Sequence, residues 1–186
     1  YDYRRKVVQT VNPNPAHIAL AEFETLFPKF NLVTQNVDVP IAIGKKAGSK
    51  NLIELHGNIQ RHKCFTCEKI FLDSNFDSQE IPPRCDCGGL LRPDVVWFGE
   101  LLPQDAMDKA HPDKSGSAQA ELFFSIGTSA IVYPAASLPF LAKENEAFVV
   151  EINTGETEIS NWVDESLLGQ AGEILPIITE FLMVTP

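Results

Sequence analysis

Three things are scarce in this sequence: long apolar runs, basic side chains and cysteines. No apolar run is long enough to cross a bilayer, which excludes a protein built on membrane-spanning helices. Lysine and arginine together number 15 against 25 aspartates and glutamates, so the formal net charge is -10. Because nucleic acids and anionic membranes are negative themselves, this balance argues against nonspecific binding to either and favours cationic protein segments as partners.

In other respects the composition is that of an ordinary globular protein. Apolar residues make up 44% and charged residues 22% of the 186 positions, which suffices for one core and a small insert. The sequence has no initiator methionine and opens on Tyr1, inside an expected helix, so it says nothing of a signal peptide at the native N-terminus. We expect a cytoplasmic protein. The oligomeric state is open, with a monomer favoured.

The spacing of apolar residues predicts an α/β protein. A helix ends near residue 10, Asn14 is a plausible cap for a second helix over 16–27, and short strands follow at 32–35 and 51–55. The clearest unit is a buried strand, a helix and a second buried strand, over 122–127, 134–144 and 147–152. This order predicts a parallel strand pair with a right-handed crossover. An amphipathic helix over 174–183 closes the chain.

The four cysteines form two close pairs inside a polar, turn-rich insert. Cys64 and Cys67 have two residues between them, and Cys85 and Cys87 have one. The first spacing points both sulfurs inward from a knuckle, and residues i and i+2 of an extended segment share a face. Four thiolates complete a tetrahedral shell, so we predict one structural Zn²⁺ rather than a catalytic one. Two disulfides or four free thiols are the alternatives.

Of the four histidines, His56 has the most informative position. It follows the strand predicted at 51–55, and strand ends in open α/β sheets face the ligand crevice. An imidazole there, with a pKa near neutrality, can act as a general base. On position alone, a hydrogen-bonded structural histidine remains the more common outcome.

A series of motifs, in order along nearly the whole chain, resembles the sirtuins, the NAD-dependent protein lysine deacylases. The resemblance is carried by Thr34-Gln35-Asn36-Val37-Asp38, Glu54-Leu55-His56-Gly57, the cysteine pairs, Leu91 to Glu100, Gly127-Thr128-Ser129, Glu151-Ile152-Asn153-Thr154 and Gly169-Gln170-Ala171-Gly172. Each motif is weak alone, but the combination is highly specific. It implies a Rossmann-like parallel sheet over 1–60 and 91–186, with a zinc-ribbon insert over 61–90.

The resemblance also implies roles for individual residues. His56 would be the catalytic base, and NAD the cosubstrate. Residues implied to contact NAD come from four segments: Gln35, Asn36, Val37, Asp38, Gly127, Thr128, Ser129, Asn153, Thr154 and Ala171. Val96, Trp97 and Phe98 would bind the acyl-lysine substrate mostly through backbone pairing, although Trp97 and Phe98 could instead be core aromatics. The expected products are free lysine, nicotinamide and acyl-ADP-ribose.

The first residues resemble one branch of the family in particular. Tyr1 and Arg4 match the Tyr-x-x-Arg pair of class III sirtuins, which bind the carboxylate of succinyl- or malonyl-lysine. Three residues apart on a helix, they share a face. Arg can hold a carboxylate through two parallel hydrogen bonds and a Tyr hydroxyl can add a third. The alternative is an ordinary cationic helix surface, since Arg5 and Lys6 follow directly.

The chain departs from the family pattern in two places. The opening strand and Gly-Ala-Gly phosphate loop of sirtuins are absent from this sequence, so we expect the parallel sheet to lack a central strand and to hold NAD weakly. The stretch from Val39 to Gly48 is longer and more apolar than its family counterpart and has no histidine. Two functions therefore compete: an NAD-dependent lysine deacylase and desuccinylase, or a noncatalytic zinc-bearing binding module on the same scaffold.

Overall fold

The computed structural model describes residues 1–38, 51–72, 80–111 and 120–184. The predicted departure at 39–48 lies outside the described residues. The described residues contain both helices and strands, as the apolar spacing predicts. The helices are α1 (Asp2–Thr10), α2 (Pro15–Leu26), α3 (Gln104–Ala110), the 3-10 turn η2 (Ala135–Ser137), α4 (Leu138–Glu144) and α5 (Ala171–Val184). None of them is long and apolar enough to cross a membrane.

The strands form three small sheets, two of them parallel. The strands are β1 (Leu32–Thr34), β2 (Leu52–Glu54), β3 (Gly57–Cys64), β4 (Ile70–Phe71), β5 (Leu91–Val95), β6 (Leu122–Ile126), β7 (Phe148–Asn153) and β8 (Glu165–Leu168). β1 pairs with β2 and β6–β7–β8 form a second sheet, all in parallel, while β4–β3–β5 is antiparallel. No ladder joins β1 to β6 among the described strands.

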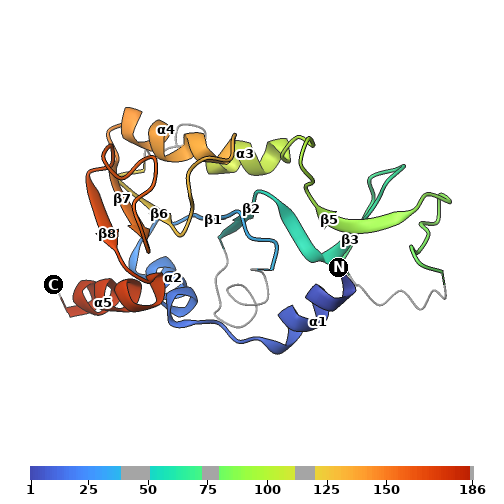
Figure 1. The fold of residues 1–186 in the computed structure, drawn as a ribbon, viewed down its shortest axis with the longest axis horizontal. Coiled ribbons are helices and arrows are strands. Elements are labelled where there is room, and N and C mark those ends of the chain that lie inside the picture. The colour runs from blue at the N-terminus through green and yellow to red at the C-terminus, as the bar shows by residue number, and fades with distance from the viewer. Residues whose placement is uncertain (39–50, 73–79, 112–119, 185–186) are drawn as a thin grey trace.

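The β6–β7–β8 sheet is covered on both faces. On one face, Phe23 of α2 and Leu175 of α5 pack against Val150 and Ile152 of β7, and all four are at most 6% exposed. On the other, Ala142 of α4 packs against Val149. Figure 1 shows α3 and α4 on one side of the strands and α2 and α5 on the other. Burial on both faces explains why β6 and β7 are mostly apolar.

Local sequence signals set the bounds of the helices. Asn14 caps α2 as predicted. Its side-chain oxygen accepts a hydrogen bond from the His17 N–H, and His17 Nδ1 accepts one from the Asn14 N–H. The helix predicted over 134–144 begins instead as η2 and continues as α4. Strand β8 and helix α3 were not predicted.

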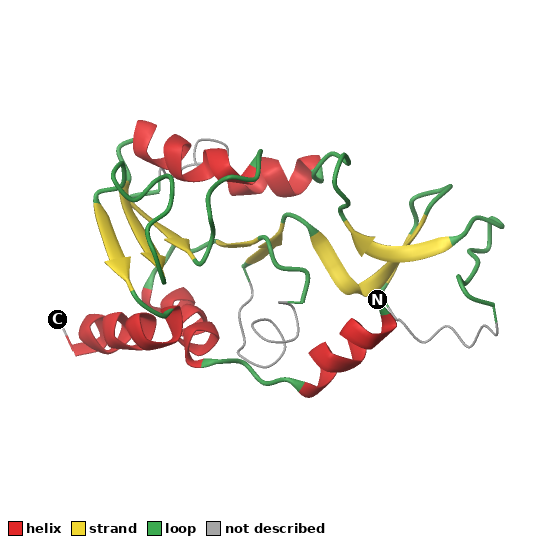
Figure 2. Cartoon of the chain, viewed as in Figure 1, coloured by secondary structure: helices red, strands yellow, loops and turns green. Residues whose placement is uncertain are grey.

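The antiparallel sheet projects from the opposite end of the molecule to α5 (Figures 1 and 2). Its strands run from Gly57 to Val95, past both bounds of the predicted insert at 61–90. Gly57 has a φ of 80°, and a Cβ there would lie 2.2 Å from the Asp94 carbonyl oxygen. Only glycine therefore fits at this position, where β3 begins and pairs with β5.

Candidate functional site

The four cysteine thiols converge at the far end of the antiparallel sheet, with all Sγ atoms within 4.8 Å of one another. Cys64 Sγ lies 3.5 Å from Cys87 Sγ, and Cys67 Sγ lies 3.7 Å from Cys85 Sγ. Sulfurs bound to a tetrahedral ion at ~2.3 Å are ~3.8 Å apart, whereas a disulfide needs ~2.05 Å. The cluster therefore fits Zn²⁺, and the four thiols are free rather than paired in disulfides.

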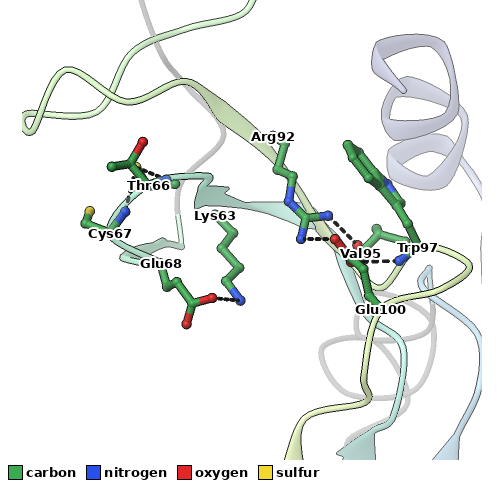
Figure 3. Close-up of polar contacts among 9 residues, drawn as sticks. Lys63, Thr66, Cys67, Glu68, Arg92, Val95, Trp97 and Glu100 are labelled. Atoms are coloured by element: carbon green, nitrogen blue, oxygen red, sulfur yellow. Dashed lines mark hydrogen bonds and ion pairs between the residues drawn. The ribbon is translucent and has the colours of Figure 1, made fainter.

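Backbone groups around Cys64 favour its metal-binding form. The N–H groups of Thr66 and Cys67 lie 3.4 and 3.5 Å from Cys64 Sγ (Figure 3), and the Cys67 amide lowers the pKa of this thiol to about 6. The thiolate is the form that ligates a metal. Gly89 passes so close that a Cβ there would lie 2.9 Å from Cys64 Sγ, which leaves no room for a side chain.

His56 lies just after β2, half-buried, at the strand end where the sequence places it. Its Nδ1 is 2.8 Å from the Gln35 carbonyl oxygen. Because a carbonyl can only accept, Nδ1 carries a hydrogen, and in the neutral ring Nε2 keeps its lone pair. The His56 carbonyl accepts the Val96 N–H at 3.0 Å. Nε2 is thus the ring nitrogen that can accept a proton.

Three of the segments implied to contact NAD are bonded to one another at the carboxyl ends of the parallel strands. Gln35 Nε2, after β1, donates to Thr128 Oγ1 at 3.4 Å. Asn153 Nδ2, at the end of β7, donates to the Thr128 carbonyl at 2.9 Å. The Gly127 N–H, after β6, donates to the Ile152 carbonyl at 2.9 Å. This is the edge at which open α/β sheets bind nucleotides.

The remaining residues implied to contact NAD follow the ends of β1, β6, β7 and β8 along the same edge. Asn36, Asp38, Ser129 and Thr154 are exposed, while Val37 is half-buried and Ala171 begins α5. The Gly169 N–H donates to the Asn153 carbonyl at 2.8 Å, which ties the segment before α5 to β7. The edge therefore presents polar groups without burying them.

The segment after β5 is fixed by one arginine (Figure 3). Arg92 Nη2 donates to Glu100 Oε1 at 2.8 Å and Nη1 to the Val95 carbonyl at 3.1 Å. Glu100 Oε2 accepts the Trp97 N–H at 2.9 Å, and the Arg92 guanidinium lies 4.4 Å from the centre of the Trp97 ring. Trp97 and Phe98 are 41% and 100% exposed, so the core-aromatic alternative is wrong.

Residues 96–100 are not a strand, although the resemblance implied one. β5 ends at Val95, and the chain then turns, with the Glu100 N–H donating to the Trp97 carbonyl. Trp97 also reaches the chain's first residue: its Nε1–H donates to Tyr1 Oη at 3.1 Å. The structure thus brings together one residue implied to hold the acyl group and one implied to hold the peptide.

The contacts that attach α1 to β3 were not predicted from the sequence. Arg5, interpreted as part of a cationic surface, is only 8% exposed and donates from Nε to the Ile59 carbonyl at 2.6 Å. Its Nη1 lies 2.7 Å from His62 Nε2. Burial, together with the Arg5 charge, lowers the pKa of His62 to about 4, so the ring is neutral and Nε2 accepts. α1 therefore docks on β3, and Tyr1 comes to lie beside Trp97.

Two further polar clusters near the site include residues of the quoted motifs, but their contacts were not predicted from the sequence. Arg61 pairs with Glu54 and Asp94, each at 2.8 Å, and so links the end of β2 to β5. Glu54 precedes His56 in the sequence and Arg61 follows it. Residues of this kind are recognisable only once the strands are paired, because ionic partners so far apart in sequence have no fixed spacing.

The second cluster surrounds Glu151, which is 1% exposed. The hydroxyls of Thr157, Ser160 and Ser166 all donate to its carboxylate, the last two at 2.5 and 2.8 Å. Burial alone would raise the pKa of Glu151, but these hydrogen bonds outweigh it and lower the pKa. The carboxylate ties the loop after β7 to β8, next to Asn153.

Comparisons with known proteins agree with this geometry. The model of the Sir2 family matches residues 1–134. A protein from Aquifex aeolicus named NAD-dependent protein deacylase is 45% identical over 183 residues, covering 98% of this chain and 74% of that protein. A solved complex of a mutant Sir2 homologue with ADP ribose superposes with a TM-score of 0.86 at 40% identity, covering 97% of this chain and 71% of the other. A structure titled Sir2 bound to acetylated peptide gives 0.82 at 33% identity, covering 96% and 74%. The chain belongs to the Sir2 family.

Proposed function

We propose that this protein removes acyl groups from the lysine side chains of other proteins, with NAD as cosubstrate. The observation that carries the proposal is His56, whose Nδ1 is held by the Gln35 carbonyl so that Nε2 is free to take a proton. Relatives named NAD-dependent protein deacylase support the activity, and a homologue in complex with ADP ribose supports the type of cosubstrate.

The residues at the strand ends have different roles in the proposed reaction. Bound NAD supplies the ribose carbon that accepts the acyl oxygen as nicotinamide departs. Thr128 and Asn153, already joined by a hydrogen bond, orient the adenosine side, and Asn36 and Asp38 orient the nicotinamide side. His56 Nε2 then removes the proton from a ribose hydroxyl, which makes that oxygen nucleophilic. The Zn²⁺ ligands lie in a different sheet and hold the shape of the substrate-binding module.

The acyl group that fits best is an acidic one. Tyr1 and Arg4 lie at the start of α1, and both are exposed. A hydroxyl and a guanidinium on one helix face can share a carboxylate, so succinyl and malonyl groups are preferred over acetyl. Thiolate ligands persist best in a reducing compartment, which supports a cytoplasmic protein. We propose that it acts as a monomer on acyl-lysine proteins.

The test is turnover of succinyl-lysine and acetyl-lysine peptides by the full-length protein, followed by mass spectrometry with and without NAD. We expect product only with NAD, and a loss of at least about 100-fold in kcat for His56→Ala, because general-base catalysis typically contributes that much. His111→Ala is the matched control, since His111 ends α3 and is expected to leave kcat unchanged. Unchanged turnover in His56→Ala would refute the assigned base. Peptide binding without turnover in the unsubstituted protein would favour the noncatalytic binding module.

A further inference from the structure

We propose that Trp97 is a positioning residue for acyl recognition, because its indole N–H sets the direction in which the Tyr1 hydroxyl donates. This inference rests on the proposed function, in which Tyr1 and Arg4 bind the carboxylate of an acidic acyl group. It adds a residue from the peptide-binding segment to that recognition.

The direction of the hydrogen bond between Trp97 and Tyr1 supports this role. Trp97 Nε1 lies 3.1 Å from Tyr1 Oη, and an indole nitrogen can only donate. Tyr1 Oη is therefore the acceptor, and its own hydrogen must point to another group. A hydroxyl that accepts one bond and donates the next is polarised by both, which strengthens donation to an anion. The pair thus prepares Tyr1 for a carboxylate rather than for a methyl group.

The indole is itself held in place on two sides. The Arg92 guanidinium stacks 4.4 Å from its ring centre, and Glu100 holds both Arg92 and the Trp97 backbone N–H (Figure 3). The side chains of Arg92 and Glu100 are 15% and 33% exposed, so the guanidinium is more shielded from solvent than the indole it contacts, which is 41% exposed. An indole stacked on a fixed guanidinium keeps its N–H direction, which a free side chain would not.

The other partner is held equally firmly. Arg5 fastens α1 to β3 through the Ile59 carbonyl and His62, one turn after Tyr1. The Arg5 N–H also donates to the Tyr1 carbonyl at 2.9 Å. Both ends of the bond between Trp97 and Tyr1 therefore belong to parts of the chain that are anchored on the same antiparallel sheet.

A double-mutant cycle tests the inference, with kcat/KM measured on succinyl-lysine and acetyl-lysine versions of one peptide. Trp97→Phe keeps an aromatic ring on Arg92 but removes the N–H. We expect it to lower kcat/KM about fivefold more for the succinyl peptide than for the acetyl peptide, as befits one hydrogen bond. In a Tyr1→Phe background the same substitution should cost nothing further, because the hydroxyl it orients is gone.

A binding measurement gives a readout that does not need turnover. Isothermal titration with the two peptides, without NAD, should show the ratio of succinyl to acetyl affinity falling about fivefold in Trp97→Phe, the loss of one hydrogen bond. Trp162→Phe is the matched control, since it removes the other indole of the chain and should leave the ratio unchanged. Glu100→Gln, which loosens Arg92, should move the ratio in the same direction by a smaller factor.

The outcomes separate this inference from the proposed function. Arg4→Met should cost the succinyl peptide far more than the acetyl peptide, and equal losses there would overturn the acyl preference itself. If Arg4→Met behaves as expected but Trp97→Phe lowers both peptides equally, the positioning role of Trp97 is overturned alone. Losses that multiply in the double variant would also overturn it.

Discussion

The β6–β7–β8 sheet and the β4–β3–β5 sheet are of equal strand number but are stabilised in different ways. The parallel sheet is enclosed by helices and buries Phe23, Ile152 and Leu175 almost completely. The buried apolar cluster of the antiparallel sheet consists of Cys64, Cys85 and Leu91, with Phe71 packed against it, and two of these supply metal ligands. A core of this size cannot offset the entropy of ordering the chain, so the metal must supply what hydrophobic burial does not.

The largest expected effect that separates the two regions is removal of the metal. Zinc binding to four thiolates contributes ~10–16 kcal/mol in small zinc modules, and the cluster around Cys64 has little else. Chelation should therefore unfold residues 61–90 and leave the parallel sheet folded. Hydrogen exchange followed by mass spectrometry would show rapid exchange confined to that segment. Protection retained there after complete removal of metal would mean that its apolar contacts suffice.

A substitution in the helix-covered core should destabilise the parallel sheet and leave the metal site intact. Phe23 of α2 is 1% exposed and its ring meets Phe27 and Phe124, each at a centroid distance of 5.8 Å. Phe23→Ala should lower the free energy of unfolding by about 3–5 kcal/mol in urea titrations, without changing zinc content. Ile18→Ala, on the exposed side of the same helix, should cost far less. A loss of zinc in Phe23→Ala would show that the two regions are not independent.

A smaller effect should come from the buried carboxylate of the parallel sheet. Glu151→Gln removes an acceptor of three hydroxyls and should destabilise the protein by about 1–3 kcal/mol at neutral pH. Because its folded pKa is lowered, the contribution of Glu151 is present above its unfolded pKa of about 4.3 and is lost as the pH falls through the folded value.

The difference between unsubstituted protein and Glu151→Gln should therefore narrow below about pH 4, as measured by urea titration at several pH values. Glu165→Gln is the control, because Glu165 is exposed and lies beside Ser166 on the same strand. A gap that stays constant with pH would mean that Glu151 acts through packing and not through its charge.

Two strands of the parallel β6–β7–β8 sheet could be predicted from the sequence because β6 and β7 are mostly apolar runs. The runs at 122–127 and 147–152 correspond to β6 and β7, and the crossover helix between them was placed to within a turn. β8 was missed because Glu165-Ser166-Leu167-Leu168 has neither strand-like alternation nor an apolar run. It becomes a strand through pairing with β7, which fixes Leu167 opposite Ile152.

In the candidate site too, features set by local sequence could be predicted and contacts between distant residues could not. The cysteine cluster was predictable because ligand spacing within a knuckle is local, and His56 because it follows a strand. The hydrogen bond between Trp97 and Tyr1 joins residues 96 positions apart, and the contact of Arg5 with Ile59 spans 54. Contacts of this range depend on how β3 pairs with β5, which no local pattern encodes.

The attachment of α1 has a consequence for how such proteins diversify. Arg5 and Gln60 fasten this helix to β3, so the helix proposed to bind the acyl carboxylate is attached to the cysteine-bearing sheet and not to the parallel one. Under that proposal, acyl selectivity can change together with this sheet between related enzymes, while the edge proposed to bind NAD stays as it is.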